Sequence, residues 1–236
     1  MSSPLATPVG SAAHPSTRRA TIPELVLVLG LPTAVFLVPS LKLLARHAGL
    51  PDFDDARFSS TLVVEAALAA LLLPFLRRRG WRVTEVAGAP EPRDVLRGAG
   101  VWLAAMAGYY LVWIVFALSA PALAETVRGQ PPAGSVSALM IVAVAVLNPV
   151  FEEFLWLGYA IPALGSRLGL RGACVVSLAL RVAVHAYQGA MAIVGILPAS
   201  AVLTWYYART RRLWPVVVAH VIMDALSLAT LAMAHR

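Results

Sequence analysis

Six ionisable side chains lie inside apolar stretches in the C-terminal half of the chain. Each costs on the order of 3 kcal/mol to place near the centre of a membrane helix, so a functional role is the default expectation for each. They are Glu152, Glu153, Arg181, His185, His220 and Asp224. Facing lipid separately would be prohibitively costly, so we expect these groups to share a polar cavity.

The spacing of these residues places them in one layer and on shared helix faces. Counted at about 1.5 Å per residue from one membrane side, Glu152 and Glu153 lie roughly 16–18 Å deep and His185 about 21 Å deep. His220 and Asp224 are four residues apart and therefore share a helix face. The adjacent glutamates point about 100° apart, so we expect one to face the cavity and the other to face a neighbouring helix.

The residue types in this layer suit hydrolysis. Pro149, just before the glutamates, is expected to kink its helix and to admit water beside them. A carboxylate takes a proton from water, one histidine orients that water, and the second histidine with Asp224 stabilises an oxyanion. A serine nucleophile is not expected, because no G-x-S-x-G motif occurs.

The same groups are also compatible with a metal site. Two histidines and a carboxylate around an open position describe a catalytic zinc site, and the ligands would be Glu152, His185 and His220. Their spacing is not the HExxH pattern. We therefore expect no cofactor and keep one zinc ion as the alternative.

Composition places these residues in a membrane protein. The chain has 236 residues, of which 59% are hydrophobic and 13% are charged, and a single soluble core could not hide so much apolar surface. We predict an all-α, polytopic transmembrane helix bundle of about seven spans, with six to eight possible and the catalytic cavity within the C-terminal four helices. The predicted spans are 22–45, 59–76, 98–120, 136–163, 172–188, 190–208 and 214–233. The predicted organisation is a disordered tail at 1–21, N-terminal transmembrane helices at 22–135 and a catalytic helix bundle at 136–233.

Arginines between the apolar stretches orient the bundle. They precede the first span, lie between 77 and 97, follow the fourth span at 167 and 171, and precede the seventh span. With seven spans all of them fall on one side, which the positive-inside rule makes cytoplasmic. The prediction is a multi-pass protein of the cell inner (cytoplasmic) membrane, N-in and C-out. Nucleic acid is not an expected partner, because no basic face is interleaved with aromatic residues.

Three stretches of the C-terminal half carry a resemblance to a known family. "FEEFLWLGYAI", "LRVAVHAYQG" and "AHVIMDAL", in this order, resemble the motifs E-E-x-x-x-R, F-x-x-x-H and H-x-x-x-N/D of the CPBP family of intramembrane proteases. That family includes the type II CAAX prenyl endopeptidases and related bacterial proteins that act in bacteriocin processing and self-immunity. The resemblance implies that Glu152 is the general base on water, that His185 shares the water, and that His220 and Asp224 stabilise the oxyanion. It also implies an ion pair for Glu153, and it leaves open whether the enzyme is metal-dependent.

Two positions depart from the family pattern. Leu157 stands where the first motif has arginine, and Arg181 stands where the second has phenylalanine. We hypothesise that Arg181 supplies the missing positive charge to Glu153 from the adjacent span. Arg181 and Asn148 are therefore assigned supporting roles beside the five candidate catalytic residues.

The partners and the alternatives follow from these assignments. An intramembrane endopeptidase implies a bilayer and a membrane-associated or exported protein or peptide as substrate. An alanine- and arginine-rich chain with few lysines suggests a bacterial source. The alternatives are a catalytically inactive membrane scaffold or chaperone, which the missing arginine favours, and a proton-coupled carrier. Glu65, alone in the second span, is expected to be neutral or paired inside the bundle.

Overall fold

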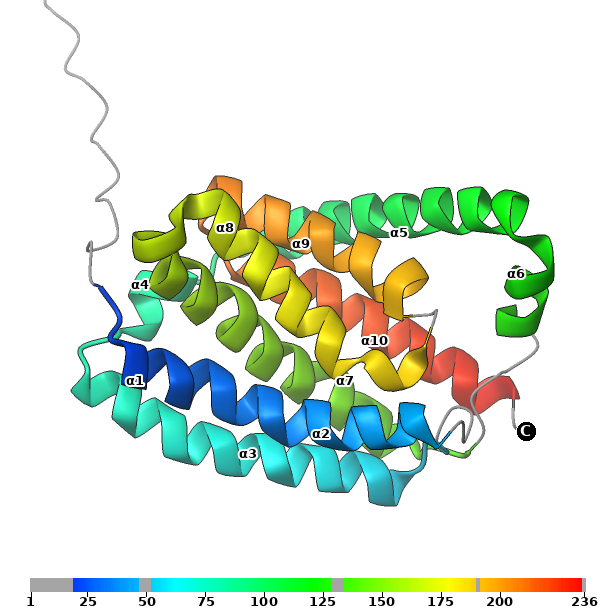
Figure 1. The fold of residues 1–236 in the computed structure, drawn as a ribbon, viewed down its shortest axis with the longest axis horizontal. Coiled ribbons are helices and arrows are strands. Elements are labelled where there is room, and N and C mark those ends of the chain that lie inside the picture. The colour runs from blue at the N-terminus through cyan, green and yellow to red at the C-terminus, as the bar shows by residue number, and fades with distance from the viewer. Residues whose placement is uncertain (1–18, 47–51, 129–133, 190–191, 235–236) are drawn as a thin grey trace, which may run out of the picture.

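The computed structural model describes residues 19–46, 52–128, 134–189 and 192–234 (Figure 1). The predicted tail therefore lies almost wholly outside the described residues. The first half of the chain forms helices joined by short connections. They are α1 (Ile22–Leu25), the π-helical η1 (Val26–Gly30), α2 (Leu31–Ala45), α3 (Asp55–Arg78), α4 (Val83–Ala87), α5 (Arg93–Ser119) and α6 (Pro121–Arg128).

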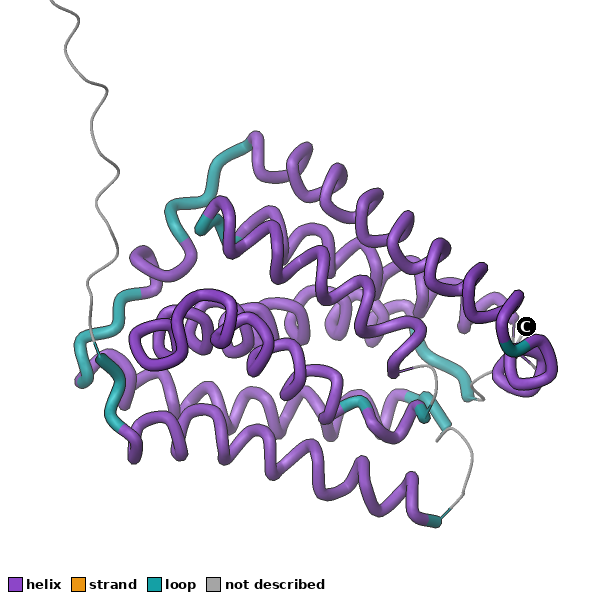
Figure 2. The backbone as a smooth tube through the Cα atoms, turned by 45° about the horizontal axis from the view of Figure 1, so that its top comes forward, coloured by secondary structure: helices purple, strands orange, loops and turns teal. Residues whose placement is uncertain are grey.

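The second half is helical as well, with three irregular turns. It comprises α7 (Ala138–Glu153), the π-helical η2 (Phe154–Tyr159), α8 (Ala160–Val184), the 3-10 helix η3 (Ala186–Gln188), the π-helical η4 (Ala192–Ile196), α9 (Leu197–Thr210) and α10 (Trp214–Ala234). The described residues form helices and loops without a strand (Figure 2). The predicted all-α fold is thereby confirmed.

Five helical segments of the described chain are long and apolar enough to cross a membrane. They are Ile22–Ala45, Asp55–Arg78, Arg93–Ser119, Ala138–Val184 and Trp214–Met233. The fourth has 47 residues and contains two of the predicted spans, because the chain reverses its direction at Gly169 (Figure 1). Gly169 has φ 68° and ψ 170°, a conformation that a residue with a Cβ rarely adopts.

The predicted sixth span differs from the other six. Its helix α9 has 14 residues and follows the π-helical turn η4, so it is not among the five long apolar segments. A regular helix of 14 residues covers about 21 Å, less than a hydrocarbon core of about 30 Å. Within the described residues each of the seven predicted apolar stretches is mainly helical, and the chain is a multi-pass membrane protein.

Side-chain caps fix where three of these helices begin. Thr21, Asp54 and Ser137 accept hydrogen bonds from backbone N–H groups at the starts of α1, α3 and α7, which satisfies donors that have no partner within the helix. Pro149 lies inside α7, and the irregular backbone begins after Glu153, where η2 starts. π-helical turns are frequently found at functional sites.

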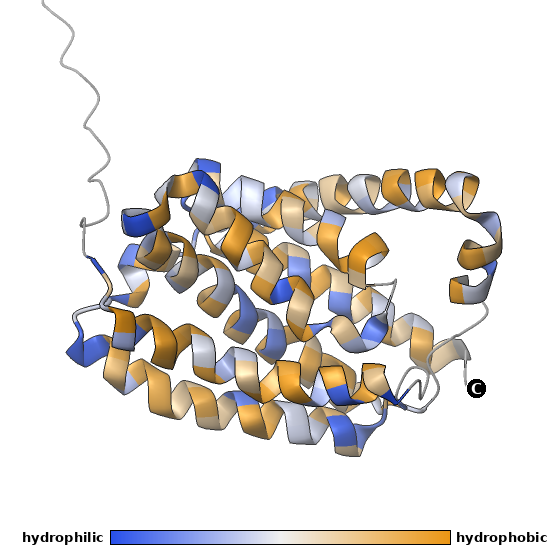
Figure 3. Ribbon diagram, viewed as in Figure 1, coloured by the Kyte–Doolittle hydropathy of each residue, from blue (hydrophilic) through white to orange (hydrophobic). Residues whose placement is uncertain are grey.

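Helix α10 packs along α5 and α7 in the middle of the bundle. Gly98 of α5 allows the close approach, because a Cβ there would lie 2.5 Å from Cγ1 of Val218. Small residues serve the same purpose between membrane helices in general. The outward sides of α3 and α5 carry exposed apolar residues such as Val63, Leu71, Leu111 and Leu118, and Figure 3 shows the apolar colour along these helices.

Contacts between distant segments gather the predicted cytoplasmic loops at one end of the bundle. Arg79, after α3, donates a hydrogen bond of 3.0 Å to Glu24 at the start of the first helix. Arg167 donates to the carbonyl of Ala20 at 2.9 Å. The first helix starts at this end, and α10 finishes at the opposite end (Figure 1).

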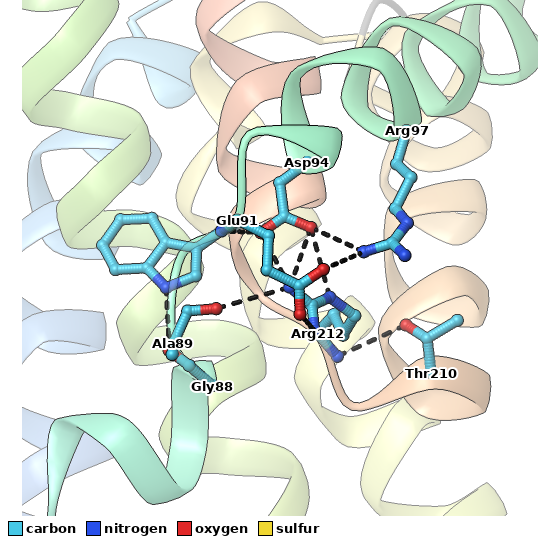
Figure 4. Close-up of polar contacts among 8 residues, drawn as sticks. Gly88, Ala89, Glu91, Asp94, Arg97, Thr210 and Arg212 are labelled. Carbon is cyan, nitrogen blue, oxygen red and sulfur yellow. Dashed lines mark hydrogen bonds and ion pairs between the residues drawn. The ribbon is translucent and has the colours of Figure 1, made fainter.

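A charged cluster ties the segment before α5 to the turn before α10 (Figure 4). The guanidinium of Arg212 donates to both carboxylate oxygens of Asp94, at 3.0 and 2.9 Å, and to Glu91 at 2.7 Å. Arg97 donates to the same two acids. The hydrogen bond to Asp94 raises the pKa of Arg212 above its usual range. The cluster fixes how α5 and α10 enter the bundle, and α10 carries two of the candidate site residues.

Candidate active site

Three helices bring the predicted site residues together. Glu152 and Glu153 lie at the end of α7, Arg181 lies near the end of α8 and His185 is the residue that ends it. His220 contributes from α10, which packs against α7. The polar groups thus meet inside the bundle, as the sequence predicts from their depth.

Glu153 is completely buried and is held by Arg181. Nη1 of Arg181 donates to Oε2 of Glu153 at 3.1 Å, and Nη2 donates to Oε1 of the same carboxylate. The side chain of Glu153 is 0% exposed and that of Arg181 is 3% exposed. Arg181 therefore gives Glu153 a positively charged partner from the adjacent helix, as hypothesised from the leucine at position 157. Two parallel hydrogen bonds are the strong geometry for an arginine–carboxylate pair.

His220 completes the environment of this buried pair. Its Nδ1 lies 2.6 Å from Oε1 of Glu153, and its Nε2 lies 3.4 Å from Oδ1 of Asp224. Arg181 lies beside it, with Nη2 3.2 Å from Nδ1. Because both ring nitrogens face carboxylate oxygens, the arrangement is satisfied when both carry protons. His220 can then act as a hydrogen-bond donor.

Glu152 has a different environment from Glu153. Its side chain is 14% exposed and lines a cavity of about 560 Å³. From the described residues its carboxylate receives two long hydrogen bonds, one from Nη2 of Arg181 at 3.5 Å and one from Nδ2 of Asn148 at 3.4 Å. The structure thus makes the division expected for adjacent glutamates: Glu152 faces the cavity, and Glu153 faces the helix interface.

His185 lines the same cavity as Glu152. Its Nδ1 lies 2.8 Å from the carbonyl oxygen of Arg181. A carbonyl only accepts, so Nδ1 carries a proton and donates it, and in the neutral ring Nε2 then has a lone pair. This tautomer presents an acceptor nitrogen, which suits a histidine that orients water.

Comparison with known proteins identifies part of the chain. Residues 134–226 match the family model described as type II CAAX prenyl endopeptidase Rce1-like. The match shows that this segment, called the family segment below, is similar to that family. The family implies a protease, in agreement with the resemblance seen in the three motifs. No curated protein and no solved structure matches the chain significantly.

The family segment holds the residues of α7, α8 and α10 described above, but not all of the cavity wall. Helices α2 and α3 also line the cavity, through Ser40, Arg57, Glu65 and their apolar neighbours. Of the described residues that line it, none comes from α10. His220 therefore contacts the buried pair and Asp224 contacts His220, and neither is among the described residues that line the cavity.

The family segment does not present the predicted zinc ligands as a set. Among the described residues there is no group of three or more His, Cys, Asp or Glu side chains arranged to hold a metal ion. His220 directs its two nitrogens at Glu153 and Asp224. His220 is therefore not free to join Glu152 and His185 around a zinc ion in this conformation, and no chemical step is assigned to one.

Two contributions to the site lie outside the predicted set. Glu65 of α3 accepts a hydrogen bond of 2.6 Å from Nδ2 of Asn148, and Oγ of Ser40 accepts one of 2.7 Å from the backbone N–H of Tyr187. The sequence marks Glu65 as a carboxyl group inside an apolar stretch, but it does not indicate the partner, Asn148, which is 83 residues away. Nothing in the local sequence marks Ser40. The family segment also contains Ser177, whose hydroxyl donates to the carbonyl of Trp156.

Proposed function

We propose that the chain is an intramembrane endopeptidase in which Glu152 is the general base on water. The observation that carries this proposal is the contrast between the two glutamates: Glu152 borders a polar cavity beside His185, and Glu153 is buried and paired with Arg181. A carboxylate with only long hydrogen bonds is free to accept a proton. Water held between Glu152 and Nε2 of His185 would lose that proton and attack the peptide carbonyl carbon.

Substrate binding completes the site in this proposal. As the carbonyl oxygen gains negative charge, the proposal assigns its stabilisation to Nε2–H of His220, with Asp224 orienting the ring. Because no described residue of α10 lines the cavity in this conformation, this step requires the bound substrate to reach His220 beyond the present lining. The distance of 3.4 Å between Nε2 and Asp224 is long for a charge-assisted hydrogen bond, for which about 2.8 Å is usual. That donor is therefore available to a substrate oxygen. Glu152 then returns its proton to the leaving amine.

The ion pair between Arg181 and Glu153 favours an enzyme over an inactive scaffold. The scaffold alternative rests on the arginine that is missing at Leu157. Because Arg181 donates two hydrogen bonds to Glu153, the charge that the family motif provides is present from another helix. The departure from the motif therefore does not deprive Glu153 of a positively charged partner.

The test of this proposal is hydrolysis in labelled water. The chain, purified and reconstituted in liposomes, is mixed with detergent-solubilised membrane proteins from cells that lack it, in H₂¹⁸O, and new peptide termini are identified by mass spectrometry. We expect at least one cleaved membrane-associated or exported protein whose new carboxyl terminus contains ¹⁸O. Identical sets of termini with and without the chain would contradict the proposal. A fluorescence-quenched peptide spanning the cleaved bond then serves for kinetics.

The orientation is a further part of the proposal. The arginine-rich end of the bundle is cytoplasmic, so the chain is N-in and C-out in the cytoplasmic membrane. The cavity extends to Phe53 and Arg57, at the start of α3 and far from Arg82 along the helix axis. The substrate would then enter from the non-cytoplasmic side.

Cysteine labelling checks this orientation. Ser60 of α3 lines the cavity and is exposed, and Arg82, in the connection that follows the opposite end of α3, is exposed as well. In a Cys174→Ser background, Ser60→Cys is expected to react with a membrane-impermeant maleimide added to intact spheroplasts. Arg82→Cys serves as the matched control and is expected to react only after the membrane is permeabilised. The reverse pattern would show that the orientation is inverted.

A further inference from the structure

Glu65 is a buried carboxyl group that belongs to none of the family motifs. It lies on α3, outside the matched residues 134–226, and only 5% of it is exposed. It lines the polar cavity together with Glu152 and also borders an apolar cavity of about 380 Å³ between α3 and α7. A leucine at this position would cost far less to bury.

The contacts of Glu65 lead to the candidate base. Nδ2 of Asn148 donates to Oε1 of Glu65 at 2.6 Å and also lies 3.4 Å from Oε1 of Glu152. An amide nitrogen carries two hydrogens, so it can donate one to each carboxyl group. Asn148 precedes Glu152 by four residues on α7 and shares its helix face. The amide therefore bridges a carboxyl group of α3 and the carboxylate in the cavity.

Glu65 has no counter-charge among the described residues. Neither Arg, Lys nor His forms an ion pair with it there, and its Oε2 is buried without a hydrogen-bond partner in the described part of the chain. Glu153, by contrast, is paired with Arg181 and His220. An unpaired carboxylate is too costly in such surroundings, whereas a neutral carboxyl group, with its carbonyl oxygen accepting from Asn148, fits them.

We propose that Glu65 is a positioning residue of the active site, which fixes the amide of Asn148 and thereby aims the carboxylate of Glu152 into the cavity. This inference rests on the proposed function of Glu152. Both hydrogen bonds to Glu152 are long, so the carboxylate depends on a rigid donor. Without Glu65 the amide of Asn148 loses its short hydrogen bond and can rotate away, and small displacements of a reacting group lower rates steeply.

Four variants, each measured in liposomes with the quenched peptide, test the inference. Glu65→Leu removes the acceptor and is expected to lower kcat about 30-fold, with KM changed by less than about 2-fold. Asn148→Leu removes the donor and is expected to have the same effect. The double variant is expected to be no slower than either single variant, because both remove one interaction. Glu65→Gln keeps a carbonyl acceptor and is expected to retain activity within about 3-fold of wild type.

Three results would overturn the inference. They are kcat within 2-fold of wild type for Glu65→Leu or Asn148→Leu, an additive loss in the double variant, or a loss in Glu65→Gln as large as that in Glu65→Leu. If Glu65→Leu does not yield folded protein, the kcat values of Asn148→Leu and Glu65→Gln test the inference. A kcat within 2-fold of wild type for Asn148→Leu, or a loss in Glu65→Gln as large as that in Asn148→Leu, would then overturn it. Glu24→Gln is the matched control, since Glu24 is also buried but contacts Arg79, Trp81 and Tyr159, none of which lines the polar cavity that contains Glu152. Full activity of Glu152→Gln would instead refute the proposed function itself.

Discussion

Glu152→Gln is expected to give a folded protein whose kcat is lower by about 10³-fold, with KM changed little. Glutamine matches glutamate in size and keeps an oxygen for the donors of Asn148 and Arg181, but it cannot accept a proton from water. General base catalysis contributes about 10²–10⁴-fold to rates. The loss should appear in kcat, because the carboxylate acts in the transition state and not in substrate binding. The measurement is kcat and KM for the quenched peptide, with thermal unfolding of the same preparation.

The matched control is the same change at the neighbouring residue. Glu153→Gln removes the partner of a buried guanidinium, so its main expected effect is on stability. We expect Glu152→Gln to unfold at a temperature near that of wild type and Glu153→Gln to unfold at a clearly lower one. A Glu152→Gln protein with more than a tenth of the wild-type kcat would exclude Glu152 as the base.

Arg181→Phe is expected to lower the free energy of unfolding by about 3–5 kcal/mol. The substitution leaves Glu153 fully buried with His220 as its remaining charged partner, and breaking a buried ion pair from one side has a cost of this size. Phenylalanine is also the residue that the family motif has at this position. The measurement is reversible unfolding in mixed micelles with increasing denaturing detergent, followed by tryptophan fluorescence.

A second substitution tests whether lost charge is the cause. Leu157 is buried one turn after Glu153, where the family motif has arginine. Adding Leu157→Arg to Arg181→Phe is expected to recover most of the stability and part of the activity. Arg181→Lys keeps the charge but not the two parallel hydrogen bonds and should fall between wild type and Arg181→Phe. An unchanged defect in the double variant would count against an exchange of the arginine between α7 and α8.

The charged residues within apolar stretches allowed much of the site to be predicted from the sequence. A carboxylate or imidazole in a membrane helix is costly wherever it stands, so its occurrence alone marks an inward-facing position. The pairing of Arg181 with Glu153 followed from one more observation, the arginine missing at Leu157. The helices themselves followed from hydropathy, because a membrane helix satisfies its own backbone groups.

Side-chain contacts that depend on how each helix is rotated about its own axis could not be predicted from the sequence. Helices that are apolar on every side carry little periodic signal for the face that packs inward. The bond between Asn148 and Glu65 joins α7 to α3 across 83 residues and depends on how both helices are turned. For the same reason the sequence placed His220 in the cavity layer, whereas its ring contacts Glu153 and Asp224 and is not among the described residues that line the cavity.

The most direct test of Glu152 as the base of a protease compares cells that lack the chain after they receive either the wild-type or the Glu152→Gln protein. Intact substrate and cleaved fragments are measured in their membranes by mass spectrometry, with the abundance of both proteins checked by immunoblotting. We predict that the uncut substrate accumulates, and co-purifies with the protein, only in the Glu152→Gln cells. Equal amounts of the cleaved products with both proteins, at equal abundance, would contradict proteolysis by this site.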